Sequence, residues 1–234
     1  MVVVEKPDDP SSVRITSDLS PLNKDIDPVL YPLPNIHDLL YNRLNLGRFD
    51  LIVLDPPWEN KSVKRKKSYQ WTFNKDLCQL DLEKLLSPNG LVVVWVTNND
   101  RLQEFLQSTL LPAWNFSLLA RFYWLKVTRH GQPVRPFGQK GREPYEVVLV
   151  AGHVNSSVAV SLPDELVFMS VPSGHPSRKP PVQELMCNLL GETEVRKTLE
   201  VFGRYLLPNT TTVGNEVFKF NHCSCFRATA DNDS

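Results

Sequence analysis

Two short, uninterrupted apolar runs constrain the fold of this chain more than any other feature. Residues 51–54 and 91–96 contain no charged or hydroxyl side chain, as is typical of strands that are buried on both faces of a parallel sheet. Between them, Leu82, Leu85 and Leu86 predict a helix that closes at residues 87–90, whose sequence is Ser-Pro-Asn-Gly. A strand, a helix and a second buried strand in this order predict an α/β fold.

The same alternation continues towards the C-terminus. Asp100 is the expected cap of a helix that stops at Pro112. Its apolar face is expected to carry Leu102, Phe105, Leu106 and Leu110. An amphipathic helix is expected over residues 182–190. Further strands are expected at residues 120–126, 145–151, 166–171, 197–202 and 216–221. The sequence therefore predicts a doubly wound, mostly parallel sheet.

The size and composition are those of one soluble globular domain, with 234 residues of which 41% are hydrophobic and 22% charged. We expect a Pro-rich, irregular lead-in over residues 1–48, the domain over residues 49–226 and a flexible tail over residues 227–234. No apolar run has membrane-spanning length, and the N-terminus lacks a signal-peptide pattern. We therefore expect a protein of the nucleus or cytosol with no membrane partner. Nothing in the sequence indicates an obligate protein partner, so we expect a monomer.

Cysteine and histidine usage argues against a metal centre. The four cysteines are too few and too scattered for a disulfide framework. Cys78 and Cys187 fall in apolar helical patterns, as small buried side chains do. The one cluster of metal-binding residue types, His-Cys-Ser-Cys at residues 222–225, has no second pair at zinc-site spacing. We expect no bound metal.

The motif Asp55-Pro56-Pro57-Trp58 directly follows the first apolar run, at the place where open α/β sheets bind their ligands. An exocyclic adenine amine has a delocalised lone pair, so methylation of this nitrogen needs fixed acceptors for its two N–H bonds. The Asp55 carboxylate would supply one acceptor and the Pro56 carbonyl the other, because Pro57 keeps its predecessor extended. Trp58 would offer a flat face to a base drawn out of its stack. The alternative is an ordinary tight turn, since Asp-Pro and Pro-Pro are common in loops.

This motif resembles that of the N6-adenine methyltransferases with an Asp-Pro-Pro-Trp signature, a family that includes the catalytic subunit of the messenger-RNA adenosine methyltransferase. Further strings fall in the family's order at residues 126–128, 140–146, 170–181, 200–204 and 214–217, so the resemblance covers roughly residues 49–226. It implies a Rossmann-like class I methyltransferase fold with a circularly permuted motif order, in which the acceptor motif precedes the cofactor strand. It also implies S-adenosylmethionine as the cofactor.

The cofactor site is expected near the C-terminal end of the domain. No glycine-rich phosphate loop follows the first strand, which argues against nicotinamide or nucleoside-triphosphate chemistry. Glu200, at the end of an expected strand, could accept hydrogen bonds from ribose hydroxyls, while Gly203 would allow a close backbone approach. By resemblance, Lys179 lies near the methionine part of the cofactor and Asn215 and Glu216 near its adenosine part; a solvated lysine and an ordinary turn are the alternatives. The expected cofactor-binding residues are Lys179, Glu200, Phe202, Gly203, Arg204, Asn215 and Glu216.

Two segments depart from the family's pattern. Residues 205–207 read Tyr-Leu-Leu where relatives often carry polar residues able to bond the ribose. Residues 210–212 are three threonines where an aromatic residue is frequent. These departures predict a weaker cofactor site.

Basic residues are concentrated after the motif, although the chain as a whole has a net charge of zero, with 26 basic and 26 acidic residues. They are interleaved with aromatic residues beside the expected base pocket, which predicts contact with RNA; a solvated loop is the alternative. A second loop, residues 128–144, is rich in Gly, Pro and basic residues, and by resemblance it borders both sites, so we expect it to gate the substrate. The expected RNA-binding residues are Lys61, Lys64, Arg65, Lys66, Lys67 and Tyr69.

The leading hypothesis is an S-adenosylmethionine-dependent enzyme that methylates adenine N6 in RNA. Residues 55–65 most resemble a branch of the family whose implied substrate is adenosine already 2′-O-methylated in U2 spliceosomal small nuclear RNA; adenine in DNA is the alternative acceptor. A catalytically inactive nucleic-acid-binding scaffold is a second hypothesis, because some members of the family keep the fold and lose the motif. The intact motif at residues 55–58 argues against a scaffold, and the altered residues 205–207 argue for one.

Overall fold

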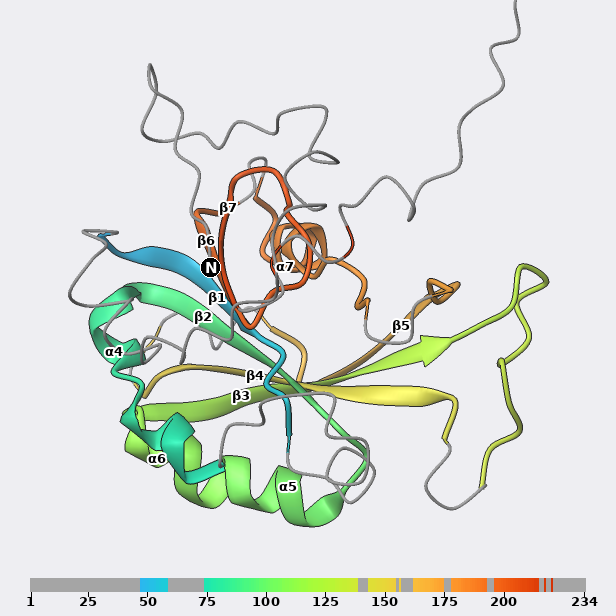
Figure 1. Cartoon of the computed structure of the whole chain (residues 1–234), viewed down its shortest axis with the longest axis horizontal. Helices are drawn as coiled ribbons and strands as arrows, with labels where there is room; N and C mark the ends of the chain where they lie inside the picture. The colour runs from blue at the N-terminus through green and yellow to red at the C-terminus, as the bar shows by residue number, and fades with distance from the viewer. Residues whose placement is uncertain are drawn as a thin grey trace, which may run out of the picture.

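The computed structural model describes residues 47–58, 74–138, 143–154, 156, 162–174, 178–192, 196–214, 217 and 220. These residues form one seven-stranded sheet in the order β5-β3-β4-β2-β1-β6-β7. Helices lie on both faces of the sheet (Figure 1), with α7 on one side and α4, α5 and α6 on the other. The arrangement is the three-layer α/β architecture that the sequence predicts.

The sheet is mixed and mostly parallel. Strand β1 pairs in parallel with β2 and β6, β6 pairs in parallel with β7, and β3 pairs in parallel with β5. Strand β4 runs antiparallel to both of its neighbours, β2 and β3. The strand bounds are β1 Phe49–Leu54, β2 Leu86–Val96, β3 Phe116–Lys126, β4 Tyr145–His153, β5 Glu165–Ser170, β6 Thr198–Val201 and β7 Thr210–Val213.

The helices complete two hydrophobic cores. Ile52 and Val92 face a core that includes Leu106 and Leu110, whereas their strand neighbours Leu51 and Val93 face a second core that includes Met186. Because side chains alternate along a strand, the central strands are buried on both faces. The helical segments are η2 Asn74–Gln79, α4 Leu82–Leu85, α5 Asp100–Phe105, η3 Leu106–Leu110, α6 Leu111–Ala113 and α7 Gln183–Leu189.

The structure corrects two expected helix ends. Strand β2 begins at Leu86, so residues 87–90 extend this strand rather than close a helix. Pro112 does not stop the helix before it, since it lies at the start of α6, which runs to Ala113. A π-helical turn, η3, ends at Leu110, two residues before this proline. Its wider hydrogen-bond ring accommodates a residue that has no N–H to donate.

The cap of the α5 helix and the last strand also differ from expectation. Asn99 is the N-cap of α5, and its side chain accepts a hydrogen bond from the Arg101 N–H at 3.1 Å. The last strand among the described residues is β7 at Thr210–Val213; of the strand expected at residues 216–221, only Val217 and Phe220 are described, and both lie in turns. A run of three threonines followed by valine has the β-branched side chains that favour a strand.

Candidate active site

One pocket lies where β1 and β6 end and where the segment before α7 crosses them. Asp55 directly follows β1, Glu200 lies in β6, and Lys179 comes from the segment before α7. The empty space in this region is about 360 Å³ when the solvent at its open mouth is counted with it. This is the edge of the sheet at which α/β proteins bind their ligands. The lining residues are Val53, Asp55, Trp95, Lys179, Pro180, Pro181, Val182, Gln183, Glu200, Phe202, Arg204, Tyr205 and Leu207.

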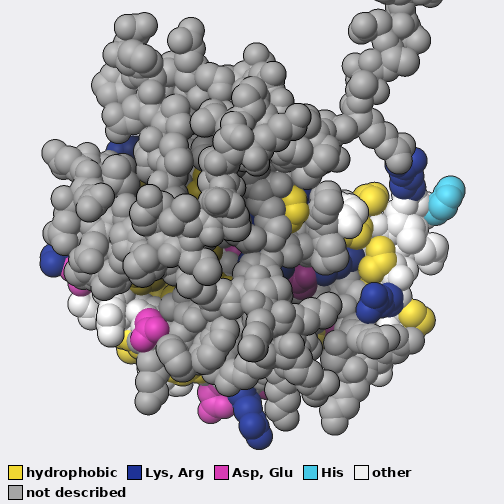
Figure 2. Space-filling model, in the orientation of Figure 1, with side chains coloured by type: hydrophobic (Ala, Val, Ile, Leu, Met, Phe, Trp, Pro, Cys, Tyr) yellow, Lys and Arg dark blue, Asp and Glu magenta, His cyan; other side chains and the backbone are white. Residues whose placement is uncertain are grey.

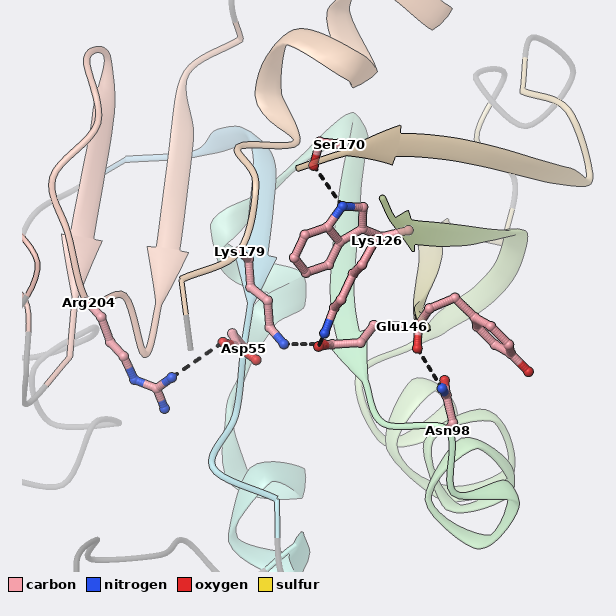
Figure 3. A network of polar contacts seen from close by, with 9 residues as sticks. Asp55, Asn98, Lys126, Glu146, Ser170, Lys179 and Arg204 are labelled. Carbon is pink, nitrogen blue, oxygen red and sulfur yellow. Dashed lines mark hydrogen bonds and ion pairs between the residues drawn. The ribbon is translucent and has the colours of Figure 1, made fainter. Parts of the chain in front are cut away.

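Asp55 is held at this pocket by its backbone and by a neighbouring cation. Its N–H donates to the Val201 carbonyl of β6 at 3.4 Å, and its Oδ2 lies 3.8 Å from Nη1 of Arg204 (Figure 3). Burial raises the pKa of Asp55 above its ordinary value, although the cations of Lys179 and Arg204 act in the opposite direction. The carboxylate is therefore a stronger proton acceptor than an exposed aspartate.

A chain of alternating charges leads from Asp55 across three elements. Lys179 and Lys126 both donate to the carboxylate of Glu146, which lies in β4, and Figure 3 shows Lys179 extended between Asp55 and Glu146. Burial alone would raise the pKa of Glu146, but the two lysines outweigh it and hold the pKa below its ordinary value. Burial lowers the pKa of Lys179, but Asp55 and Glu146 outweigh it and leave the pKa raised. Lys179 is therefore a fixed cation between two carboxylates.

Glu200 is the least satisfied acid of the pocket. Its residue is 8% exposed, and its Oε2 atom has no hydrogen-bond partner within the described part of the chain. Burial and the nearby Asp55 raise the pKa of Glu200 to about 7, against the opposing effect of Arg204. A buried polar atom is rarely left without a partner, so this carboxylate is suited to accept a hydrogen bond from a ligand.

Comparison with known proteins agrees with this arrangement. A family model, MT-A70, matches residues 49–216, which include every strand of the sheet. The chain belongs to the MT-A70 family. The MT-A70 match contains both the Asp55 motif and the β6 strand that carries Glu200.

Relatives of the chain have names that describe adenine methylation. The chain is 37% identical to the human N(6)-adenine-specific methyltransferase METTL4 over 190 residues, which are 77% of this chain and 40% of that protein. It is 38% identical to a DNA N6-methyl methyltransferase of Caenorhabditis elegans over 76% of this chain and 48% of that one. It is 36% identical to the N6-methyladenosine RNA methyltransferase MTA1 of Cryphonectria parasitica over 74% of this chain and 52% of that one. The chain thus spans about half or less of the length of these relatives. The resemblance expected from residues 55–65 is confirmed, because METTL4 proteins of human and mouse are each 37% identical to this chain.

The structure corrects the expected orientation of Trp58 in the MT-A70 motif. Trp58 is 5% exposed and belongs to the same hydrophobic core as Leu106 and Leu110. Its Nε1–H donates to the Trp95 carbonyl at 2.8 Å. An indole that is buried in this way offers no free face to a base. Its role is to fasten the motif loop to β2.

The Pro56 carbonyl, the second expected acceptor, already accepts the Trp58 N–H at 2.8 Å. A carbonyl oxygen has two lone pairs. The second lone pair of Pro56 remains for an adenine amine, so this part of the expectation stays a prediction.

The packing between the turn after β6 and strand β7 requires a glycine at position 203. A Cβ at Gly203 would lie 2.3 Å from Cγ2 of Thr212, and a Cβ at Gly214 would lie 2.8 Å from the Gly203 carbonyl oxygen. The missing side chain therefore lets the turn after β6 pack against β7, and the expected close approach of Gly203 to a cofactor stays a prediction. Phe202, which precedes it, has a φ of +68° and donates its N–H to the Val213 carbonyl at 2.7 Å.

Tyr205, which departs from the family's pattern, has a structural partner. Its hydroxyl donates to the Lys179 carbonyl at 2.8 Å, and the Arg178 guanidinium lies 5.1 Å from the centre of its ring. Tyr205 therefore ties the turn after β6 to the segment that carries Lys179. Sequence reasoning also assigned no role to Glu146 or Lys126, although a charged pair at the ends of two apolar strands is a signal that could have indicated one.

The loop expected to gate the substrate begins beside this charge network. Residues 127–133 form a hairpin after β3, with Val127 bridged to Pro133 and the Thr128 N–H donating to the Gln132 carbonyl at 2.7 Å. Val134 and Phe137 beyond it are exposed. Figure 2 shows hydrophobic, basic and histidine side chains gathered on the side of the molecule where this hairpin lies. The gating role stays a prediction.

Several expected residues lie outside the described part of the chain. They are Lys61, Lys64, Arg65, Lys66, Lys67, Tyr69, Asn215 and Glu216, as is the cluster at residues 222–225. Within the described ranges, no group of three or more His, Cys, Asp or Glu side chains is arranged to hold a metal ion. No helix in the same ranges combines the length and the apolar character needed to cross a bilayer.

Proposed function

We propose that this protein transfers a methyl group from S-adenosylmethionine to N6 of adenine in RNA. The observation that carries the proposal is that Asp55, the acid of the acceptor motif, and Glu200, an unsatisfied acid in β6, line one pocket. An acceptor amine and a cofactor that were bound by these two acids would meet in the same pocket. Proximity of this kind accounts for much of the rate of a direct group transfer.

The residues present fit the cofactor. Glu200 Oε2 lacks a donor within the described residues, which suits ribose hydroxyls. The cations of Lys179 and Arg204 line the same pocket and suit the carboxylate of its methionine part. S-adenosylmethionine would supply an electrophilic methyl group on a sulfonium centre.

The acceptor side depends on Asp55 and Pro56. Oδ atoms of Asp55 and the free lone pair of the Pro56 carbonyl would accept the two N–H bonds of the adenine amine and so turn its lone pair towards the methyl group. As the new N–C bond forms, the nitrogen becomes cationic and must lose one proton. Because burial raises the pKa of Asp55, its carboxylate is suited to take this proton.

The acceptor nucleic acid forms the finer part of the proposal. The names of the relatives divide between RNA and DNA: MTA1 is named for RNA and the nematode relative for DNA. We propose RNA, and within it 2′-O-methyladenosine of U2 small nuclear RNA, because residues 55–65 resemble the branch of the family for which this substrate is implied. A spliceosomal substrate would place the protein in the nucleus.

The test is a methylation assay with the purified chain and three oligonucleotides: a U2 fragment carrying 2′-O-methyladenosine, the same RNA without the 2′-O-methyl group, and the matching single-stranded DNA. Mass spectrometry of the nucleosides should find N6-methylation, fastest on the first substrate, and none with an Asp55→Ala variant. Calorimetry with S-adenosylmethionine distinguishes the enzyme, which should bind the cofactor, from a scaffold, which should not. Cofactor binding without methylation of any of the three oligonucleotides would contradict the proposed acceptors.

A further inference from the structure

Gln183 is a buried polar residue of the pocket that the proposed function does not use. It is the first residue of α7 and is 6% exposed. Its Oε1 atom has no hydrogen-bond partner within the residues that the structure describes. Gln183 lines the same pocket as Glu200, whose Oε2 atom is unpartnered in the same sense. Two buried acceptors without donors therefore share one pocket.

The presence of both oxygen atoms in one pocket is informative because buried side-chain oxygens without a hydrogen-bond partner are rare. Buried side-chain oxygens in folded proteins are almost always hydrogen-bonded to protein or water. The described residues contain four unpartnered buried side-chain N or O atoms, and the other two, in His153 and Thr212, are not part of the pocket lining. Two such oxygens on different elements, α7 and β6, would suit a ligand that brings two donors.

The polar side chains around them are already engaged. The Tyr205 hydroxyl donates to the Lys179 carbonyl, and the Lys179 ammonium donates to Glu146. Arg204 lies against Asp55. A cationic group of a ligand would be drawn to the carboxylate of Asp55 rather than to the neutral amide of Gln183. A pair of neutral hydroxyl donors fits the remaining acceptors better.

We propose that Gln183 is a cofactor-binding residue whose Oε1 accepts a hydrogen bond from one hydroxyl of the ribose, while Glu200 accepts from the other. This proposal rests on the proposed function, because it takes S-adenosylmethionine as the ligand of the pocket. The proposal gives the ribose site a second, uncharged hydrogen-bond acceptor, which comes from α7. The sequence offers no motif for it, since Gln183 falls within an expected amphipathic helix.

The test is calorimetric titration of S-adenosylhomocysteine and of its 2′-deoxy and 3′-deoxy analogues. The proteins are the wild type, Gln183→Met, which keeps the size and removes the acceptor, and Gln107→Met, a matched change in η3 outside the pocket. Gln183→Met should weaken binding of S-adenosylhomocysteine about tenfold, the factor that one hydrogen bond commonly contributes. One of the two deoxy analogues lacks the hydroxyl that Gln183 binds. Wild type and Gln183→Met should bind that analogue with the same affinity. Gln107→Met should change nothing.

The outcomes separate this inference from the function on which it rests. If the wild type does not bind S-adenosylhomocysteine, the cofactor assignment fails and the inference fails with it. If the wild type binds and Gln183→Met binds equally well, or loses the same factor with all three ligands, only the inference is overturned. Should Gln183→Met not fold by circular dichroism, Gln183→Asn keeps the amide and withdraws its oxygen by one methylene. It should show the same selective loss, and an unchanged affinity would overturn the inference.

Discussion

Ionisation of Glu200 should make the stability of this protein fall as the pH rises from about 4.5 to about 7. The pKa of Glu200 is raised from 4.5 to about 7 because the carboxyl group is buried near Asp55. Between these two values the folded chain holds a proton that the unfolded chain has released, so the free energy of unfolding decreases with pH and levels off above about pH 7. A rise of this size corresponds to roughly 3 kcal/mol. Asp55, whose pKa is also raised, contributes with the same sign.

The perturbation that isolates this effect is Glu200→Gln, since an amide resembles the protonated acid and does not titrate. We expect the variant to match the wild type near pH 4.5 and to exceed its free energy of unfolding by up to about 3 kcal/mol at pH 8.5. Urea denaturation followed by tryptophan fluorescence at half-unit steps of pH measures the difference. Glu104→Gln, a change at an exposed carboxylate of α5, is the control and should show no such trend. A difference between wild type and Glu200→Gln that does not vary with pH would refute the reasoning.

Three further predictions concern the motif and the RNA. Asp55→Ala should abolish methyl transfer and leave calorimetric binding of S-adenosylmethionine largely intact; near-normal turnover would end the acceptor-site proposal. Trp58→Phe should lower the free energy of unfolding by about 1–3 kcal/mol, because the Trp95 carbonyl loses its buried donor, and an unchanged urea midpoint would show that the indole N–H is not needed. Neutralising Lys64, Arg65, Lys66 and Lys67 together should weaken RNA binding and make the RNA affinity depend less steeply on salt concentration. Cofactor binding should stay constant. Equal salt slopes in wild type and variant would mean that these residues form a solvated loop that does not contact RNA.

The central strands and the acceptor motif could be predicted from the sequence because the signals are local. Residues 51–54 and 91–96 are apolar on both faces, and they form the neighbouring strands β1 and β2. The position of Asp55 follows from the end of β1, since a residue directly after a parallel strand lies at the ligand-binding edge of the sheet. Glu200 could be predicted for the same reason, from the strand that became β6.

The direction of Trp58, the charge network and the role of Gln183 were decided only by the tertiary structure. An indole can face a base or the core, depending on whether a neighbouring strand has an acceptor for its N–H. Here the Trp95 carbonyl of β2 accepts the N–H of Trp58. Lys126, Glu146 and Lys179 meet because β4 runs antiparallel between β2 and β3, a pairing that no local pattern specifies. Local periodicity fixes which side chains are buried, whereas the order of strands fixes which buried groups become neighbours. The hydrogen bonds, pKa shifts and unpartnered oxygens of this pocket all depend on that second choice.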